Sequence, residues 1–456
     1  MIIPKILHTI SKTLTLKGAK PIIVGGSVRD HFLGIEAKDF DIEVYGLATI
    51  EELEEILKTF GRVELVGKSF GVLKFIYQGE EYDFSFPRTE VKIAKGHKGF
   101  SCLIDGNYSY ERAAKRRDFT VNAMGYDIEK KSFLDPFGGR GDMKEKVLRH
   151  IDDETFVEDP LRIYRGVQFC ARFGYVMDDK TKELCSIMIE KGALEELAKE
   201  RVYEEFKKLL LKANKPSIGF ELMREIGVLK YFPELGALIG VAQEKKWHPE
   251  GDVWIHTMMA LDAMTALLTG DEKRDLMLMY AELCHDFGKP STTKVIDGRI
   301  RALGHERAGL EPTQNFMQGL SNEQDFIDKI LPLVNYHLSP SKFYHDKSSK
   351  SAVRRLSTKV VIEDLVLVAK ADFLGRTTKE ALRGEYPAGE WLLDMAKNLD
   401  VVNSAPKMLL QGRDLITLGL KPSPEFKKIL DKVYEMQLDG EIRTLEEAVE
   451  MARGLI

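Results

Sequence analysis

The first third of the chain alternates between apolar and polar positions, which is the pattern of half-buried strands. It predicts strands at residues 21–24, 39–44, 71–77 and 80–86, and Gly79 between the last two predicts a hairpin. In the rest of the chain, apolar residues recur at helical spacing almost to the end. The pattern therefore predicts an α+β protein, in which a small N-terminal sheet domain precedes a mainly helical body.

Interruptions of these patterns divide the chain further. They fall near residue 140 (DPFGGRGD), near 233–250 and near 380–405. The predicted domains are a head over residues 1–140, a helical neck over 141–235, a third domain over 236–380 and a helical tail over 381–456. In the tail, Thr444 and Glu447 have the spacing of a capping box before the last helix.

Composition narrows the class of protein. The 456 residues are 44% hydrophobic and 30% charged, which excludes a disordered chain or a fibre. A net charge of −5 excludes a uniformly basic nucleic-acid coat but leaves room for a local basic patch. Four cysteines without a CxxC pair indicate a reduced protein without a cysteine zinc site. No apolar run approaches the ~18 residues of a membrane span, and the start is too polar for a signal peptide. We therefore expect a cytoplasmic protein with no membrane partner.

Residues 39–44 place acidic side chains on one face of the predicted strand. Asp39, Asp41 and Glu43 alternate with apolar residues that should face the core. Two carboxylates at this spacing are roughly 6.5–7 Å apart at Cα, a span that can hold two cations. Oxygen ligands of this kind suit Mg²⁺. The alternative interpretation is an ordinary solvated strand face.

A glycine turn supports the metal interpretation. Gly25 and Gly26 follow a predicted strand and open a short helix that contains Arg29, so backbone N–H groups and a guanidinium could meet a triphosphate. The segment is neither a GxxxxGK[ST] loop nor a GxGxxG motif. Asp83, on the polar side of residues 80–86, is a candidate third carboxylate; it could equally be a solvent-facing residue.

Four motifs in order resemble one family. They are VGGSVRD at 24–30, KDFDIEV at 38–44, KRRDFTVNAM at 115–124 and EDPLRIYRGVQFCARFG at 158–174. Together they resemble the class II tRNA nucleotidyltransferases, the CCA-adding enzymes of the polymerase-β superfamily, with bacterial poly(A) polymerases as close relatives. The resemblance extends from about residue 20 to at least residue 376, and the tail also resembles family C-termini.

This resemblance implies roles for residues of the head. Asp39 and Asp41 match the pair that binds catalytic metal, and Gly26, Arg29 and Arg117 match contacts to the triphosphate. Asp118 could fix the arginines in place. The alternative for Arg117 and its neighbour is a solvated basic turn.

The resemblance also implies that Asp159, Arg162 and Arg165 read the incoming base. Cytosine and adenine both present an amino donor beside a ring-nitrogen acceptor, so an acid and an arginine could pair with both and reject uracil and guanine. Asp159, which precedes Pro160, is also a good N-cap for a helix.

A second set of metal-type residues lies in the helical body, in the order H…HD…D. It resembles the HD-domain phosphohydrolases. The matching metal ligands are His256, His285, Asp286 and Asp372, and the outer histidines are His305 and His337. Imidazole and carboxylate ligands suit a divalent transition metal that activates water, and Lys289 is placed to meet a phosphate. The alternative is that these are satisfied core histidines.

Two further segments suggest RNA handling. Residues 88–114 are rich in Lys and Gly and match a family segment needed for the final A addition. Residues 342–359 hold six Lys or Arg against one Asp, beside aromatic residues, which suits an RNA backbone. A solvated basic face is the other interpretation of this second segment.

The sequence thus predicts an enzyme that adds C, C and A to tRNA 3′ ends from CTP and ATP, with a second, HD-type phosphohydrolase activity on 2′,3′-cyclic or 2′-phosphate ends. The alternatives are a bacterial poly(A) polymerase and a CC-only or A-only enzyme. An alarmone enzyme would place the HD set before the nucleotidyltransferase, the reverse of the order here. A non-catalytic RNA-binding protein would leave the carboxylates without a use.

Overall fold

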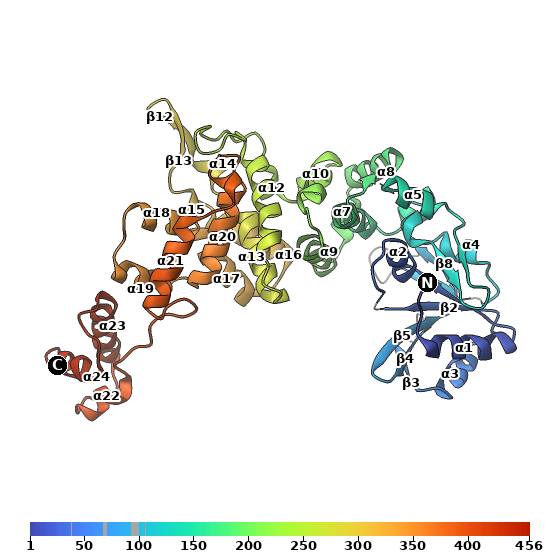
Figure 1. The fold of residues 1–456 in the computed structure, drawn as a ribbon, viewed down its shortest axis with the longest axis horizontal. Helices are drawn as coiled ribbons and strands as arrows, with labels where there is room; N and C mark the ends of the chain where they lie inside the picture. The colour runs from blue at the N-terminus through green and yellow to red at the C-terminus, as the bar shows by residue number, and fades with distance from the viewer. Residues whose placement is uncertain (38, 67–70, 93–99, 105) are drawn as a thin grey trace. The chain divides into compact units, whose positions relative to one another are not determined.

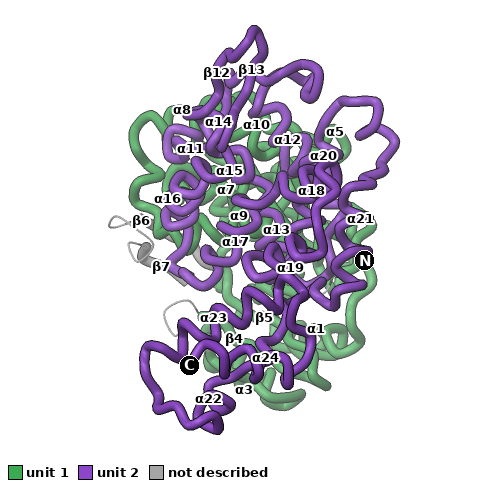
Figure 2. The backbone as a smooth tube through the Cα atoms, turned by 90° about the vertical axis from the view of Figure 1, so that its left-hand side faces the viewer, with its two compact units in different colours: residues 1–213, 218–228 green, residues 214–217, 229–456 purple. Residues whose placement is uncertain are grey.

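The computed structural model describes all residues except 38, 67–70, 93–99 and 105 (Figure 1). The chain forms two compact units, residues 1–213 with 218–228 and residues 214–217 with 229–456 (Figure 2). The finer division into four domains stays a prediction. Within the described residues, no helix is both long and apolar enough to cross a membrane.

The first unit contains a seven-stranded sheet in the order β3-β4-β5-β2-β1-β8-β9. The strands are β1 (Lys20–Val24), β2 (Asp41–Tyr45), β3 (Arg62–Val66), β4 (Val72–Tyr77), β5 (Glu80–Ser85), β8 (Gly125–Asp127) and β9 (Ser132–Leu134). β2 lies antiparallel to β1 and parallel to β5, while β4 and β5 form the predicted hairpin. The predicted α+β class is confirmed.

β2 begins two residues later than the sequence pattern predicted. Its first residue, Asp41, pairs with Val24, the last residue of β1, so the ladder with β1 ends there. Asp39 lies in the segment that leads into the strand, with its side chain exposed. The helices α1 (Lys5–Leu16) and α3 (Ile50–Lys58) contribute apolar side chains to the core that the sheet's apolar residues form.

Part of the Lys- and Gly-rich segment 88–114 is described. β6 (Arg88–Lys92) and β7 (Phe100–Ile104) form a separate antiparallel pair, whereas residues 93–99 lie outside the described residues. Helices follow: α7 (Leu161–Phe173), α8 (Asp179–Glu190) and α9 (Lys199–Lys212), with α7 packed on α9. α7 buries nine of its thirteen residues, which makes it a rigid support for side chains on its remaining face.

The second unit is built around four packed helices, α12 (Val253–Met264), α13 (Glu272–Cys284), α17 (Gln324–Tyr336) and α20 (Ile362–Leu374) (Figure 1). α12 is apolar on nearly all sides because other helices surround it. The tail helices α22 (Gly412–Thr417), α23 (Pro424–Asp439) and α24 (Leu445–Arg453) have a small core of their own. The predicted capping box of Thr444 and Glu447 is present at the start of α24.

Candidate functional sites

Strand pairing places three carboxylates together in the head. Asp41 and Asp83 are register partners on the parallel strands β2 and β5, so their side chains stand side by side on one face. Asp39 is close enough that its charge, like that of Asp83, raises the pKa of Asp41. The largest cause of that raised pKa is the loss of water around the Asp41 carboxylate, although the residue still reaches solvent. These carboxylates repel one another and offer only oxygen ligands, a combination that suits a hard divalent cation.

The glycine turn lies directly against this site. Gly25 has a φ of +73°, and a Cβ built there would lie 3.2 Å from Nη1 of Arg117 and 3.9 Å from Oδ2 of Asp41. The backbone conformation therefore favours glycine, and a side chain there would press on the end of Arg117. The helix α2 (Gly26–Phe32) starts at the next residue, so the glycine turn, the arginine and the first carboxylate meet at one point.

Glu43 holds the arginines of the KRRD segment. Its carboxylate is 2% exposed and accepts hydrogen bonds from Arg116 (3.1 Å) and Arg117 (2.8 Å), as well as from the Tyr45 hydroxyl (2.7 Å). Burial alone would raise the pKa of Glu43, but the two guanidinium groups lower it below its usual value. The sequence pattern placed Glu43 on the acidic face and missed this role.

Arg29 is buried rather than solvated. It donates to Oδ1 of Asn122 (2.8 Å) and to Oδ1 of Asp30, and its guanidinium carbon lies 5.4 Å from the Phe169 ring centroid and 4.7 Å from that of Phe173. The two phenylalanine rings of α7 thus hold the guanidinium of Arg29, which lies on α2.

Asp118 is a buried acid whose partner is Arg165, whereas Glu43 rather than Asp118 holds the arginines that precede it. Asp118 accepts from Nε of Arg165 (2.7 Å) and from Nδ2 of Asn122 (3.0 Å), and Asn122 in turn binds Arg29. Burial would raise the pKa of Asp118, but Arg165 and these hydrogen bonds lower it. One buried carboxylate therefore links an arginine of α7 to one of α2.

The three candidate base-reading residues line the same cavity as the glycine turn and Asp41. Its volume is about 480 Å³. Its lining comprises Gly25, Gly26, Arg29, Asp41, Arg116, Arg117, Asp118, Asn122, Asp159, Leu161, Arg162, Arg165, Phe169 and Arg201. Six of these are arginines, so the field in the cavity favours a polyanion.

Asp159 is positioned by contacts on both of its oxygens. Oδ1 accepts from the Leu161 N–H (3.1 Å) and Oδ2 from Nη2 of Arg201 (3.2 Å). The sequence predicted Pro160 as the first residue of this helix, but α7 begins one residue later, at Leu161. The Asp159 carboxylate still accepts from a backbone N–H of the first turn. Arg162 donates to the carbonyls of Thr155 and Arg116, both at 2.6 Å. Arg201 has no local sequence signal and was missed.

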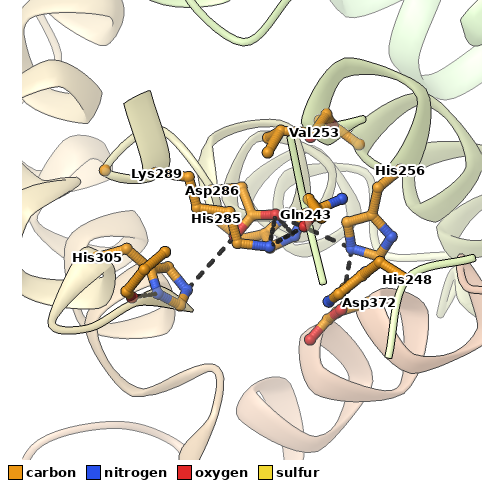
Figure 3. A network of polar contacts seen from close by, with 12 residues as sticks. Gln243, His248, Val253, His256, His285, Asp286, Lys289, His305 and Asp372 are labelled. Atoms are coloured by element: carbon orange, nitrogen blue, oxygen red, sulfur yellow. Dashed lines mark hydrogen bonds and ion pairs between the residues drawn. The ribbon is translucent and has the colours of Figure 1, made fainter. Parts of the chain in front are cut away.

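The HD residues converge in the second unit, most of them at helix ends (Figure 3). His256 lies on α12, His285 follows α13, His337 follows α17 and Asp372 lies on α20. His305 begins the short α15 (His305–Ala308). Among the described residues, three groups have ligand atoms within 4.8 Å of one another. The first is His256, His285 and Asp372, the second is Asp286, His305 and His337, and the third is His248, Glu250 and His256.

Hydrogen bonds to backbone carbonyls fix the Nδ1 atoms of three of the histidines. Nδ1 of His285, His305 and His337 lies 2.6–2.7 Å from the carbonyl oxygens of Glu282, Ala302 and Val334. Because a carbonyl only accepts, each Nδ1 donates and each Nε2 is left to bind a metal. Nδ1 of His256 instead lies 3.0 Å from Oε1 of Glu250. Residues 247–250, the WHPE segment, therefore supply the partner of His256.

This cluster brings together imidazole nitrogens and carboxylate oxygens that could hold a metal ion. Nε2 of His285 and the Asp286 carboxylate are both buried, and Oδ2 of Asp286 lies 3.2 Å from that nitrogen. Nε2 of His256 is 3.1 Å from Asp372, and Nε2 of His305 is 3.4 Å from Asp286. Lys289 lies 2.7 Å from Asp286 at the edge of the cluster. Burial and the neighbouring His305 lower the pKa of His337 to about 3, which keeps that ring neutral as a ligand must be.

The basic segment 342–359 has a structural use. Arg354 donates to the Leu438 carbonyl at the end of α23 (3.2 Å), and Arg355 pairs with Glu435 and Asp439 of the same helix. These two arginines therefore attach the tail to α19 (Lys350–Ser357). Contact between RNA and the lysines of the segment stays a prediction.

Comparisons with known proteins agree with this architecture. Residues 22–149 match the family model described as the poly A polymerase head domain, and residues 174–238 match the probable RNA and SrmB-binding site of polymerase A. The chain is thus similar to this head domain and to its neighbouring RNA-binding region over these two segments.

Solved structures of CCA-adding enzymes share the whole fold. A complex with CTP is 24% identical with a TM-score of 0.64, covering 100% of this chain and 96% of the other. The Bacillus stearothermophilus enzyme with CTP is 21% identical, with a TM-score of 0.66 and coverages of 98% and 97%. The Thermotoga maritima enzyme with tRNA is 22% identical, with a TM-score of 0.61 and coverages of 100% and 96%. The fold is that of these CCA-adding enzymes, as the motifs predicted.

Proposed function

We propose that this chain is a tRNA nucleotidyltransferase that adds C, C and A to tRNA 3′ ends from CTP and ATP. The observation that carries the proposal is that Asp41, with Asp39 and Asp83 beside it, lines an arginine-rich cavity together with the Gly25 turn and Arg117. Structures of the same fold contain CTP, ATP or tRNA, which supports these three partners.

In this reaction the tRNA 3′-hydroxyl oxygen forms a bond to the α-phosphorus, and the bond to the β-phosphate oxygen breaks to release pyrophosphate. Asp39 and Asp41, with Asp83 beside them, would hold Mg²⁺, which supplies charge neutralisation at the triphosphate and alignment of the hydroxyl. Gly26, Arg29 and Arg117 bind the triphosphate oxygens. Asp159 accepts from the exocyclic amino group of C or A, while Arg162 and Arg165 provide donors for the ring-nitrogen side of the base.

Separate incubation with CTP or ATP tests this function. The substrates are tRNA ending in the discriminator base, tRNA-C and tRNA-CC. A CCA-adding enzyme extends the first two with CTP and only the third correctly with ATP. A poly(A) polymerase would extend all three with ATP. A CC-only enzyme would stop once tRNA-CC is formed, and an A-only enzyme would extend only tRNA-CC. Asp39→Ala should abolish addition; persistence at the normal rate would contradict the assignment of the metal site.

We further propose that the second unit is a metal-dependent phosphohydrolase acting on 2′,3′-cyclic or 2′-phosphate ends of RNA. The convergence of buried imidazole and carboxylate ligand atoms from separate helices supports it. A divalent transition metal held by His256, His285, Asp286 and Asp372, with His305 and His337 nearby, would supply activation of water. Hydrolysis of RNA ending in a 2′,3′-cyclic phosphate, measured with Mn²⁺, Co²⁺ or Ni²⁺ and lost in Asp286→Ala, is the test.

A further inference from the structure

The cavity above the HD cluster is lined on one side by an exposed tryptophan. It has a volume of about 240 Å³, and its lining includes Asp286, Lys289, Gln243, Arg376 and Trp247. Trp247 is 56% exposed, although a large aromatic side chain is ordinarily covered. The WHPE segment supplies Glu250 to the metal cluster, but that role leaves Trp247 without an explanation.

The inner part of the cavity is prepared for an anion. Lys289 lies there with its Nζ donating to Oε1 of Gln243 (2.5 Å). In the described part of the chain, Nε2 of Gln243 and Nε of Arg376 are buried without an acceptor. Gln243 is 5% exposed. Unused donors at buried positions are costly unless a ligand satisfies them, and a phosphate offers the acceptors.

The cavity is too small for a whole nucleotide. Pockets that enclose complete small ligands are roughly 300–1,000 Å³, so about 240 Å³ accommodates a phosphate with part of a sugar. Any group attached to that sugar must lie at the opening, where Trp247 presents its ring. Lys246 lies over the same ring, with Nζ 4.9 Å from the centroid, which adds a cation for a nearby phosphate.

The loop that carries Trp247 is held in place from two sides. The Trp247 N–H and the His248 N–H both donate to the Glu244 carbonyl. The Glu244 carboxylate also accepts from the Ile300 N–H at 3.3 Å, which ties the loop to the hairpin of β12 (Thr293–Ile296) and β13 (Arg299–Ala302). The ring is therefore presented by a fixed loop, as a stacking surface requires.

We propose that Trp247 is the stacking surface for the nucleobase of the nucleotide whose phosphate enters the HD cavity. The site would then take nucleoside phosphates, free or at an RNA 3′ end, in preference to other phosphate esters. This inference rests on the proposed phosphohydrolase function, because it assigns the substrate class of that site. Trp247 acts here as a specificity residue and does not touch the reacting bonds.

Calorimetric titration of the full chain tests the assignment. The probes are adenosine 2′-monophosphate, a short RNA ending in a 2′-phosphate, and glycerol 2-phosphate, which has no base. Trp247→Ala should weaken binding of the first two about tenfold, since stacking on an aromatic side chain has that magnitude. It should leave glycerol 2-phosphate unchanged, and Trp247→Phe should restore most of the affinity. Equal affinities of Trp247→Ala and the parent chain for adenosine 2′-monophosphate would overturn the proposal. A loss seen only with the RNA would also overturn it, because Trp247 would then contact an earlier nucleotide.

Fluorescence gives a readout that does not depend on hydrolysis. The chain has three tryptophans, of which Trp254 is fully buried. Adenosine 2′-monophosphate should quench the emission of the parent chain and of Trp391→Phe, but not that of Trp247→Phe. If this holds while no metal supports hydrolysis, the phosphohydrolase proposal fails and the base site stands. If nucleotides and glycerol 2-phosphate are hydrolysed equally and Trp247→Ala changes neither, the hydrolase stands and the base site falls.

Discussion

Asp41 on β2 and Asp83 on β5 are direct register partners, and the Asp83 N–H donates to the Phe40 carbonyl at 3.1 Å. Two residues more than forty positions apart in the sequence therefore become adjacent carboxylates. Their mutual repulsion is relieved when a divalent cation lies between them.

The first prediction concerns this pair. Asp41→Asn should reduce nucleotide addition to tRNA by at least about a hundredfold, because a charge that stabilises the transition state is removed. Asp83→Asn should have an effect in the same direction. Glu81→Gln is the matched control, because Glu81 lies on β5 like Asp83 but pairs with Lys74. This variant should retain full activity. Incorporation of labelled CTP measures all three; a normal rate for Asp41→Asn would refute the prediction.

Glu43 should matter for stability as well as for activity. Glu43→Gln leaves two arginine contacts without a buried counter-charge, and breaking such a pair costs about 3 kcal/mol or more. Urea unfolding should show this loss, together with a raised KM for CTP. Glu64→Gln removes an exposed partner of Arg62 and should cost less than about 1 kcal/mol. Similar losses for both variants would argue against the buried role.

The same carboxylate predicts a dependence on pH. The pKa of Glu43 is lowered in the folded protein, so the stability that it contributes is present above the pKa of about 4.3 of an unfolded glutamate and is lost as the pH falls through the folded-state pKa. The difference in unfolding free energy between the parent chain and Glu43→Gln should therefore be constant near neutral pH and shrink in acid. A difference that stays constant down to pH 3 would contradict the lowered pKa.

Arg201 should control base selection through Asp159. Arg201→Met keeps the aliphatic stem but removes the hydrogen bond to Oδ2, which leaves the carboxylate held on one side only. We expect KM for CTP and ATP to rise roughly tenfold, as for the loss of a hydrogen bond to a charged group, and misincorporation of UTP to increase. Arg224→Met, which removes an exposed arginine, is the control. Unchanged nucleotide preference in Arg201→Met would exclude this positioning role.

Metal should stabilise the second unit. A ligand at a hundred times its Kd adds about 2.7 kcal/mol to the unfolding free energy, so Mn²⁺ or Co²⁺ should raise the thermal unfolding midpoint of the parent chain. Asp286→Asn should abolish that increase without affecting CTP incorporation. Asp297→Asn, at the exposed turn between β12 and β13, should keep the full increase. The same increase in Asp286→Asn would show that the metal binds elsewhere.

Local patterns were sufficient for the elements and for the main candidates. A two-residue period places Asp41 and Glu43 on the polar face of a strand, and a glycine pair after a strand marks a turn, because both properties depend on only a few neighbouring residues. The order of the histidines and aspartates in the helical body was also readable. None of this identified which of these residues touch.

Tertiary structure decided those contacts. Glu43 meets Arg117 across 74 positions, and His256 meets Asp372 across 116. Asp83 lies beside Asp41 because β2 is placed between β1 and β5 in the sheet. Arg201 reaches Asp159 because α9 packs on α7. A sequence period specifies which face of an element is buried, but packing over the whole chain selects the element that covers it. The sequence therefore determined which charged and metal-binding residues this protein has, and only the fold decided which charges became partners.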